Sequence, residues 1–363
     1  MLRGGIEAVQ EAASIIARGG VAAFPTETVY GLGADAFNPT AVAKVYAAKG
    51  RPGDNPLIMH VANRDKFYAL TQDPPAYAQA LIENFWPGPL TLVAKKKPGL
   101  PAWVGGHPKG TADTVGIRMP SHPLALALIE KSGCVVAAPS ANLAGTPSPT
   151  QAQHVADDFK NGEIDFILDG GAVPGGLEST VVDVTGPEPV MLRPGAVTVE
   201  MISRATGLKT HVPDMKVHTE KPTPDKTVNE TMQSAAPPRS PGMKYRHYAP
   251  KAPMTLIMGS ESDIAAYVQS QIEMDNLRIG ILVTTETEAV LRKSLGDVKA
   301  LHFITLGQKA SPETIAHNLY AALRQFDAIG VDVIYAEGPA QDGLGIAIMD
   351  RMKKAAEGRV EYV

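Results

Sequence analysis

Short apolar runs alternate with stretches of helical periodicity over the first 194 residues of the chain. The runs have the length and the β-branched content of buried strands: "VAAF", "PLIMHV", "LTLVAK", "TVGIRM", "CVVAAP", "IDFIL", "STVVDV" and "PVMLR". Apolar spacing predicts helices over residues 6–17, 41–48, 76–85, 124–131 and 151–159. Because some strands follow one another without a helix, the pattern predicts a twisted, mixed α+β sheet.

The pattern changes after residue 205. Residues 206–250 are rich in proline and polar residues and show no sustained period, which is typical of a linker. Beyond them, "PMTLIM", "LRIGILVT", "ALHFITLG" and "VDVIYAEG" are each followed by a helix-compatible stretch. Four such units predict a small, parallel, Rossmann-like domain. We therefore expect an α/β protein with a first domain over 1–205, a linker over 206–250 and a second domain over 251–363.

Composition supports two globular domains and excludes several classes of protein. The 363 residues are 44% hydrophobic and 20% charged, and the net charge of −4 gives no overall basic excess for coating nucleic acid. Cys134 is the single cysteine, so an intramolecular disulfide is excluded and a small buried hydrophobe is favoured over a nucleophile. No apolar run reaches the ~18 residues of a membrane span, and the sequence predicts a cytoplasmic protein without membrane association.

Polar residues cluster where two of the predicted strands end. "FPTETVYGLG" (24–33) places hydroxyls, a carboxylate and two glycines after a strand, and "APSANLAG" repeats the pattern with Ser140 and Asn142. Open α/β sheets bind ligands at such ends. The alternative for the first stretch is a solvated turn in which Thr26 or Thr28 caps a helix. The glycines of "GGAVPGGLEST" leave a similar choice between phosphate binding and a hairpin turn.

Four cations stand in positions that suggest anion binding. "AAKGRPGDNPL" places Lys49 and Arg51 at the end of a helix, where complementing the helix dipole is the alternative role. Arg118 and Arg193 lie within apolar runs, and a buried arginine needs an anionic partner. We expect both to face one polar cleft, with structural salt bridges as the alternative. The G-x-x-x-x-G-K-[ST] motif of P-loop ATPases is absent from the sequence.

Taken together, "PTETVYGLG", the K-x-R of Lys49 and Arg51, the S-x-N of Ser140 and Asn142, "ESTVVD", "RPG" and "SPGMKYRHYAP" resemble the threonylcarbamoyl-adenylate synthases, a YrdC-like family, in its long two-domain form. The resemblance implies a nucleotidyltransferase that joins L-threonine, bicarbonate or CO2, and ATP into L-threonylcarbamoyl-adenylate and pyrophosphate. It also implies that a partner machinery transfers the threonylcarbamoyl group to the adenosine beside the anticodon of ANN-reading tRNAs. Mg²⁺ is expected on the phosphates, held mostly by substrate oxygens and water, with no metal site made by the protein itself.

The resemblance also assigns residues to roles, position by position. The catalytic residues it implies are Lys49, Arg51, Ser140 and Asn142. For L-threonine it implies Thr28, His60, Arg118, Ala138 and Thr180. For ATP it implies Arg51, Asn55, Thr114, Ser140, Ser148, Arg193 and Ser240. On the residues alone, Arg118 suits a bidentate clamp on the threonine carboxylate, whereas His60 fits a core histidine equally well.

Three further interpretations remain open. Lys95, Lys96 and Lys97 form a short basic run, so weak direct RNA binding is one, although no aromatic residues are interleaved with the run. "GPAQDGLG" follows a predicted strand and indicates either a small-ligand site or a tight turn. "SPGMKYRHYAP" carries the turn residues and aromatics of a lid, and we hypothesise that it folds over the catalytic cleft with Ser240 near the nucleotide.

Overall fold

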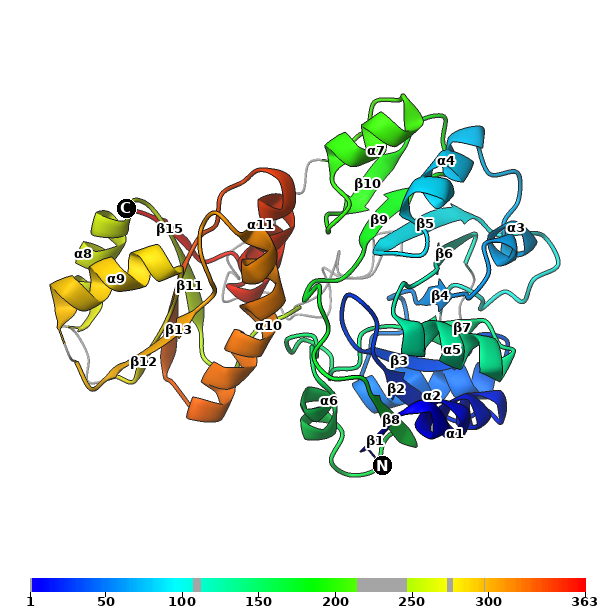
Figure 1. Cartoon of the computed structure of the whole chain (residues 1–363), viewed down its shortest axis with the longest axis horizontal. Helices are drawn as coiled ribbons and strands as arrows, with labels where there is room; N and C mark the ends of the chain where they lie inside the picture. The colour runs from blue at the N-terminus through cyan, green and yellow to red at the C-terminus, as the bar shows by residue number, and fades with distance from the viewer. Residues whose placement is uncertain (1, 107–111, 214–246, 273–276, 297) are drawn as a thin grey trace, which may run out of the picture.

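The computed structural model describes residues 2–106, 112–213, 247–272, 277–296 and 298–363. These residues form two parts, each built around its own sheet (Figure 1). Within the described residues, no helix is long and apolar enough to cross a membrane. The predicted domain boundaries stay a prediction, because residues 214–246 lie outside the described part of the chain.

The first part holds a sheet that has ten strands in the described residues, in the order β1-β8-β2-β3-β7-β4-β6-β5-β9-β10. Its strands are β1 (Leu2–Gly4), β2 (Ala22–Phe24), β3 (Gly31–Asp35), β4 (Ile58–His60), β5 (Leu90–Lys95), β6 (Thr114–Arg118), β7 (Val136–Ala138), β8 (Phe166–Asp169), β9 (Thr180–Asp183) and β10 (Val190–Arg193). Parallel pairs such as β4–β6 and β5–β9 stand beside antiparallel pairs such as β2–β3 and β5–β6. The mixed sheet expected from the sequence is confirmed.

Helices cover this sheet and pack their apolar faces against it. They are α1 (Ile6–Ala17), α2 (Pro39–Lys49), α3 (Asp65–Leu70), α4 (Ala76–Phe85), α5 (Pro123–Ser132), α6 (Ala152–Asp158) and α7 (Val199–Thr206). The apolar faces of α1 and α5 meet over Phe24 and Phe166, and those of α2 and α6 join a separate cluster around Tyr30. The predicted helices over 6–17 and 76–85 agree with α1 and α4, whereas α3 and α7 were not predicted.

The end of α2 sets the position of two of the predicted cations. Asn38 caps the helix by accepting from the backbone N–H groups of Thr40 and Ala41, both at 3.1 Å, and Pro39 opens the first turn. Gly50 ends it in the left-handed conformation, with φ of 60°. Lys49 therefore sits on the last turn of the helix, and Arg51 begins the loop that leaves it.

The opening stretch differs in part from what the sequence predicted. Gly31 and Gly33 belong to β3, a strand that was not predicted, and Gly31 lines a cavity as expected at a binding edge whereas Gly33 does not. A Cβ on Gly33 would lie 2.7 Å from both Phe24 Cε1 and Val136 Cγ1. Packing against the aromatic ring and the neighbouring strand therefore requires this glycine. The polar residues Thr26 and Thr28 lie in the connection between β2 and β3.

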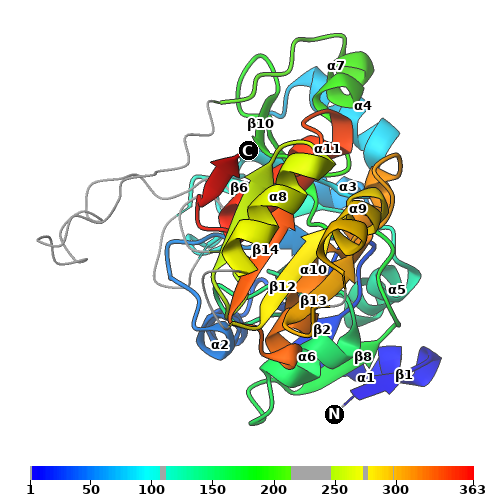
Figure 2. The ribbon, with the colours of Figure 1, turned by 90° about the vertical axis from the view of Figure 1, so that its left-hand side faces the viewer.

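The second part is a parallel sheet with the strand order β13-β12-β14-β11-β15 in the described residues. Figure 2 shows β13, β12 and β14 of this sheet side by side. Its strands are β11 (Met254–Met258), β12 (Ile279–Val283), β13 (Leu301–Thr305), β14 (Val333–Glu337) and β15 (Val360–Tyr362), and its helices are α8 (Glu261–Ile272), α9 (Thr285–Leu295), α10 (Pro312–Ile329) and α11 (Gly343–Ala355). All described pairings are parallel, which confirms the Rossmann-like prediction. The short β15 was not predicted.

Helices α10 and α11 form the side of the second part that faces the first (Figure 1). Val29 and Leu177 of the first part belong to the same buried apolar cluster as the core side chains of α10 and α11. The approach is close at Gly176, where a Cβ would lie 2.3 Å from the carbonyl oxygen of Ala316 on α10. Arg324 adds a partly buried ion pair across the boundary, with Asp158 at 2.7 Å. The two parts are thus packed together without a spacer.

Candidate active site

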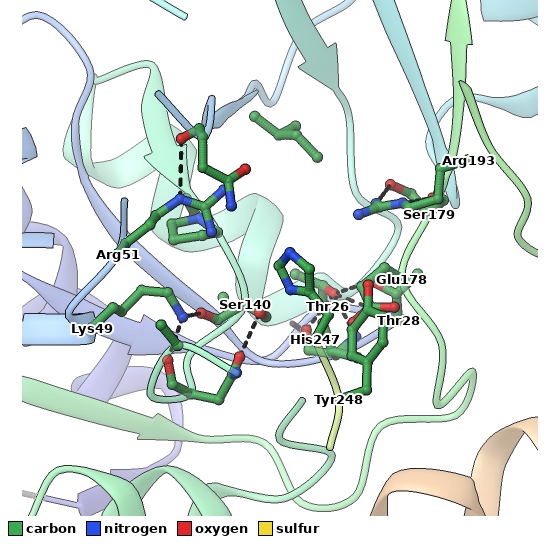
Figure 3. Close-up of a pocket in the computed structure, with 18 of the residues that line it drawn as sticks. Thr26, Thr28, Lys49, Arg51, Ser140, Glu178, Ser179, Arg193, His247 and Tyr248 are labelled. Carbon is green, nitrogen blue, oxygen red and sulfur yellow. Dashed lines mark hydrogen bonds between the residues drawn. The ribbon is translucent and has the colours of Figure 1, made fainter. Parts of the chain in front are cut away.

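A cavity of about 290 Å³ collects most of the residues predicted to form a site. Its walls come from the β2–β3 connection, the end of α2, the segment after β7, the start of β9, the end of β10 and residues 247–248 (Figure 3). The predicted residues that line it are Thr28, Lys49, Arg51, Asn55, His60, Arg118, Ala138, Ser140, Asn142 and Arg193. The sequence therefore identified residues that are far apart in the chain and close together in the fold.

Lys49 is buried on this wall, with 3% of its surface exposed. Its ammonium donates to the backbone carbonyl of Ser140 at 2.6 Å and to that of Asn142. Burial, and then the nearby Arg51, hold the pKa of Lys49 well below its usual range. A cation that is held only by neutral carbonyls in this way is stabilised when an anion enters the cavity.

The S-x-N motif holds Lys49 through its backbone and stabilises its own loop through its side chains. Ser140 Oγ donates to Asn142 Oδ1 at 2.5 Å, and Asn142 Nδ2 donates to the carbonyls of Leu143 and Thr146 at 2.8 and 3.0 Å. These hydrogen bonds fix the loop whose carbonyls bind the lysine. Positioning is therefore the role that the geometry supports for both residues, and direct contact with a substrate stays a prediction.

Arg51 and Asn55 line the cavity from the loop that follows α2. Arg51 donates from Nε to the carbonyl of Asn55 at 3.2 Å and from Nη2 to that of Pro56 at 2.7 Å. Burial lowers the pKa of Arg51 to about 10, so it remains a cation at neutral pH. Asn55 is buried, and its Oδ1 has no hydrogen-bond partner among the described residues. This amide oxygen is therefore suited to accept a hydrogen bond from a ligand.

Arg118, at the end of β6, is buried and already bound on several sides. Nη1 donates to Thr28 Oγ1 at 2.9 Å, Nε donates to the carbonyl of Gly88 at 3.3 Å, and Nη2 lies 2.7 Å from Glu27 Oε1. Burial alone would raise the pKa of Glu27, but the Arg118 guanidinium more than offsets this and lowers it. The salt bridge left open as an alternative for Arg118 is present. A ligand carboxylate at Arg118 would share the guanidinium with Glu27.

His60, next to Arg118 across the β4–β6 pairing, is neutral. Burial and then the Arg118 charge lower its pKa to about 3. Its Nδ1 lies 3.1 Å from the carbonyl of Ile58, and its ring packs edge-on against Phe24 at 6.0 Å between centroids. His60 has the packing of a core histidine and also lines the cavity, so the structure combines both sequence-based interpretations.

Arg193 closes the opposite wall (Figure 3). It follows the irregularity in β10 and donates to the backbone carbonyl of Ser179 at 3.1 Å and to Ser179 Oγ at 3.2 Å. Ser179 Oγ is also within 2.8 Å of Thr91 Oγ1 on the neighbouring strand β5. The guanidinium is therefore anchored to Ser179, the residue that precedes β9.

Four of the predicted site residues do not line the cavity as described. Thr180 Oγ1 donates to the carbonyl of Val197 at 2.8 Å and accepts from its N–H, so it supports the turn after β10. Thr114 begins β6 beside Lys95. Ser148 is fully buried and donates to Glu178 at 2.6 Å. Ser240 lies outside the described residues. The roles predicted for these four stay predictions.

Thr26, Glu178 and Ser179, which were not assigned to substrates, also line the cavity, together with His247 and Tyr248 of the segment hypothesised to form a lid. Glu178 and Ser179 begin "ESTVVD". This stretch is part of the resemblance to the family, but neither residue was predicted to have a role in the site. Tyr248 is buried with φ of 64°, an unusual conformation for a large side chain. His247, with a pKa lowered to about 3 by burial and then by Arg51, is neutral there.

His247 and Tyr248 belong to the segment hypothesised to form a lid. Both line the cavity, and Tyr248 stacks on Tyr320 of α10 at 5.3 Å between ring centroids. Residues 240–246 of the segment lie outside the described residues. The lid therefore stays a hypothesis, although the end of the segment reaches the cavity.

Comparison with known proteins places the chain in a family. A family model described as Telomere recombination matches residues 14–195, and one described as Threonylcarbamoyl-AMP synthase, C-terminal domain, matches residues 197–357. A Bacillus subtilis (strain 168) relative named Threonylcarbamoyl-AMP synthase is 46% identical over 354 residues, covering 97% of this chain and 94% of the relative. A Schizosaccharomyces pombe relative of the same name is 39% identical and covers 92% of this chain and 84% of the relative.

A solved structure agrees with these sequence relatives. The crystal structure of Pyrococcus abyssi Sua5 complexed with L-threonine is similar to this chain with a TM-score of 0.84 and 40% sequence identity. The similarity covers 100% of this chain and 99% of the other. Both domains, and their packing against each other, are therefore shared with that protein. The chain belongs to the threonylcarbamoyl-AMP synthase family, in the form that carries both the catalytic and the C-terminal domain.

Proposed function

We propose that this chain is an L-threonylcarbamoyladenylate synthase that makes threonylcarbamoyl-AMP and pyrophosphate from L-threonine, CO2 or bicarbonate, and ATP. The observation that carries the proposal is one cavity lined by Lys49, Arg51, Arg118 and Arg193. Three of the four are buried, and Arg118 pairs with Glu27 at 2.7 Å. Such a wall favours a polyanion like the triphosphate of ATP.

The chemistry needs no protein nucleophile. The threonine amine adds to CO2 and loses a proton, which gives a carbamate. A carbamate oxygen then attacks the α-phosphorus of ATP, the bond to the β-phosphate oxygen breaks, and pyrophosphate leaves with the electron pair. Catalysis of this step consists of holding the two reactants in line and stabilising the charge on the phosphates.

Different residues serve the two substrates in this proposal. Lys49, Arg51 and Arg193 bind the phosphates as cations, and Asn55 accepts from the nucleoside. Arg118, with Thr28 beside it, takes the threonine carboxylate by sharing its guanidinium with Glu27, while neutral His60 offers a hydrogen-bonding edge without adding a charge.

Mg²⁺ is also part of the proposal, as a companion of ATP. Among the described residues, no cluster of three or more His, Cys, Asp or Glu side chains is arranged to hold a metal ion. Glu178, the one carboxylate that the described residues place in the cavity wall, already accepts from Ser148, Tyr320 and Arg351. The residues present thus fit an ion that is carried by phosphate oxygens and water.

The product also implies a partner. A threonylcarbamoyl-adenylate is a mixed anhydride that water destroys, so we propose direct transfer to the machinery that modifies the tRNA adenosine beside the anticodon, in the cytoplasm. Weak direct RNA binding at Lys95–Lys97 has less support, because the ammonium of Lys96 donates to the carbonyls of Pro101 and Ala102 at 3.2 and 2.9 Å. A salt series of tRNA binding tests it, since phosphate contacts weaken steeply with salt.

The decisive experiment is pyrophosphate release with L-threonine, bicarbonate, ATP and Mg²⁺, omitting one component at a time. We expect release only in the complete mixture, together with threonylcarbamoyl-AMP identified by mass spectrometry of the quenched reaction. Adding EDTA in excess over Mg²⁺ tests the ion. Release that does not depend on threonine would contradict the proposed function and indicate an ATP pyrophosphohydrolase instead.

A further inference from the structure

Arg351 of α11 is a C-terminal-domain residue that binds two segments of the catalytic domain. Its side chain is 0% exposed. Nε donates to Glu178 Oε2 at 2.8 Å, Nη2 donates to the carbonyl of Pro194 at 3.1 Å, and Nη1 donates to Asp350 at 2.5 Å. Two of its three partners therefore lie across the domain boundary.

The two partners are the sequence neighbours of cavity residues. Glu178 precedes Ser179, and Pro194 follows Arg193 (Figure 3). Arg193 donates two hydrogen bonds to Ser179. Arg351 therefore binds the residue next to each member of this contact, Glu178 beside Ser179 and Pro194 beside Arg193. The second domain thus stabilises the part of the cavity wall that carries Arg193.

Two further side chains hold Glu178 in place. Tyr320 of α10 donates to Glu178 at 3.0 Å, and Ser148 donates to it at 2.6 Å. Burial alone would raise the pKa of Glu178, but Arg351 and then Arg193 offset this and lower the pKa to about 2. Glu178 therefore remains a carboxylate in the cavity wall, and its charge is balanced mainly from the second domain.

We propose that Arg351 is a positioning residue for nucleotide binding, which acts by holding Glu178 and Pro194 so that Arg193 faces the phosphates of ATP. This inference rests on the proposed function for the identity of the nucleotide. Without Arg351, the buried Glu178 carboxylate would take Arg193 as its partner, because Arg193 is the next strongest cation acting on it. A buried charge that loses its partner is strongly destabilising, which makes this rearrangement favourable.

The effect should be specific to ATP. Arg118 and Thr28, on the threonine side, are held by contacts within the catalytic domain, to each other and to Gly88 and Glu27. Loss of Arg351 leaves these contacts in place. A larger rise in the KM for ATP than in the KM for threonine therefore indicates that Arg351 positions the residues that bind the phosphates. Equal rises would indicate a general destabilisation of the fold.

The test compares full-length Arg351→Met, Glu178→Gln/Arg351→Met and Arg351→Lys with the wild type. ATP affinity is measured by titration without turnover, and KM values for ATP and threonine by pyrophosphate release, at matched folded fractions determined by circular dichroism. Arg292→Met is the control, because it makes the same substitution at an ion pair within the C-terminal domain, with Glu288 at 2.7 Å, neither member of which lines the cavity.

We expect Arg351→Met to weaken ATP binding and raise its KM about tenfold or more, with the KM for threonine changed less than about threefold. The double variant should recover most of the ATP affinity, because no uncompensated carboxylate remains. Arg351→Lys keeps the charge but cannot bridge both partners, so its ATP affinity should be intermediate; it replaces Arg351→Met if that variant does not fold. Arg292→Met should leave ATP affinity within about twofold of the wild type.

Unchanged ATP affinity in folded Arg351→Met, or in folded Arg351→Lys where the methionine variant fails to fold, would overturn the inference. Equal losses for ATP and threonine, or no recovery in the double variant, would also overturn it and leave Arg351 a structural residue. A wild type that binds ATP but releases no pyrophosphate contradicts the proposed function alone. A wild type that binds no ATP contradicts both.

Discussion

Each of the two sheets has a buried cluster of polar side chains near the ends of its strands, and the two clusters are satisfied in different ways. In the C-terminal domain, Glu337 at the end of β14 accepts from Thr284 and Thr287, each at 2.8 Å, and pairs with Lys309 at 2.9 Å. In the catalytic domain, Lys49 is held by the carbonyls of Ser140 and Asn142 and Arg51 by those of Asn55 and Pro56.

The difference lies in what neutralises the charge. Carboxylate, hydroxyls and ammonium in the C-terminal cluster satisfy one another, so the cluster is complete within the protein. Backbone carbonyls orient Lys49 and Arg51 without cancelling their charge, and this leaves a positive field for an incoming anion. Polar side chains at strand ends therefore indicate a binding site only when their partners leave charge uncompensated.

The glycines that made the C-terminal strand end look like a ligand site are explained by packing. A Cβ on Gly338 would lie 2.1 Å from Met258 Sδ, and one on Gly345 would lie 2.0 Å from the carbonyl oxygen of Ala340. The tight turn, one of the two interpretations of "GPAQDGLG", accounts for both glycines without a ligand.

The strongest test of the comparison removes one of the uncompensated cations. We expect Arg51→Ala to lower kcat/KM for pyrophosphate release by a factor corresponding to about 2–4 kcal/mol of transition-state stabilisation. Arg278→Ala serves as the control, because Arg278 is a 57% exposed arginine of the C-terminal domain. Near wild-type release by Arg51→Ala would show that the positive wall is not what binds the phosphates.

Acid should destabilise the protein through the histidines of the cavity. His60 and His247 have pKa values of about 3 in the fold, below the usual 6.5 of the unfolded chain. The unfolded state therefore binds more protons between pH 6.5 and 3, and stability falls as the pH drops through this window. The loss from pH 7 to 5 should be about 2 kcal/mol per histidine.

Denaturant unfolding of the wild type and of His60→Gln at both pH values measures this loss. The glutamine variant should lose about 2 kcal/mol less than the wild type between pH 7 and 5. An equal pH dependence in the two proteins would mean that His60 titrates normally, and that the cavity does not exclude a further cation.

Arg118 differs from Lys49 and Arg51, because it has Glu27 as a partner. Arg118→Lys should raise the KM for threonine about tenfold and that for ATP less than about threefold, since an ammonium cannot serve Glu27, Thr28 and a carboxylate together. Steady-state kinetics with each substrate varied in turn gives the two values. An equal rise in both would remove Arg118 from the threonine side.

The smallest effect is expected in the completed cluster of the C-terminal domain. Glu337→Gln keeps the shape of the side chain and loses the ion pair with Lys309, whose side chain is 40% exposed. We expect a loss of about 1 kcal/mol in the free energy of unfolding and no change in either KM. A KM that moves with this variant would show that the second strand end takes part in the reaction.

Strong local signals were predicted well from the sequence. The helix at 6–17 has a sustained apolar period, and the four β-then-α units of the C-terminal domain are each bounded by turn residues. The strand β3 was missed because "GLGAD" has glycines in place of β-branched residues, and their cause, the ring of Phe24, lies on another strand. The short β1 and β15 are edge strands without an apolar pattern of their own.

In the candidate site, too, residues with a local sequence signal could be predicted and residues that depend on distant partners could not. Lys49 and Arg51 could be found because they stand in a recognisable turn, and Arg118 and Arg193 because a cation in an apolar run is conspicuous. The role of Glu178 could not be found, because its partners Tyr320 and Arg351 are more than 140 positions away and belong to another domain. Thr180 was assigned to threonine by resemblance, whereas its hydroxyl is bound to Val197.

Gly176 restricts how the two domains could be exchanged between proteins. A single added carbon at this position would clash with the backbone of α10. A chimera of two family members would therefore need a glycine at position 176 together with an α10 that packs equally close to it. Recombination at the linker would therefore yield well-docked hybrids only from parents that share this contact. Gly176→Ala is the simplest imitation of a mismatched hybrid, and small-angle scattering should show its domains moved apart.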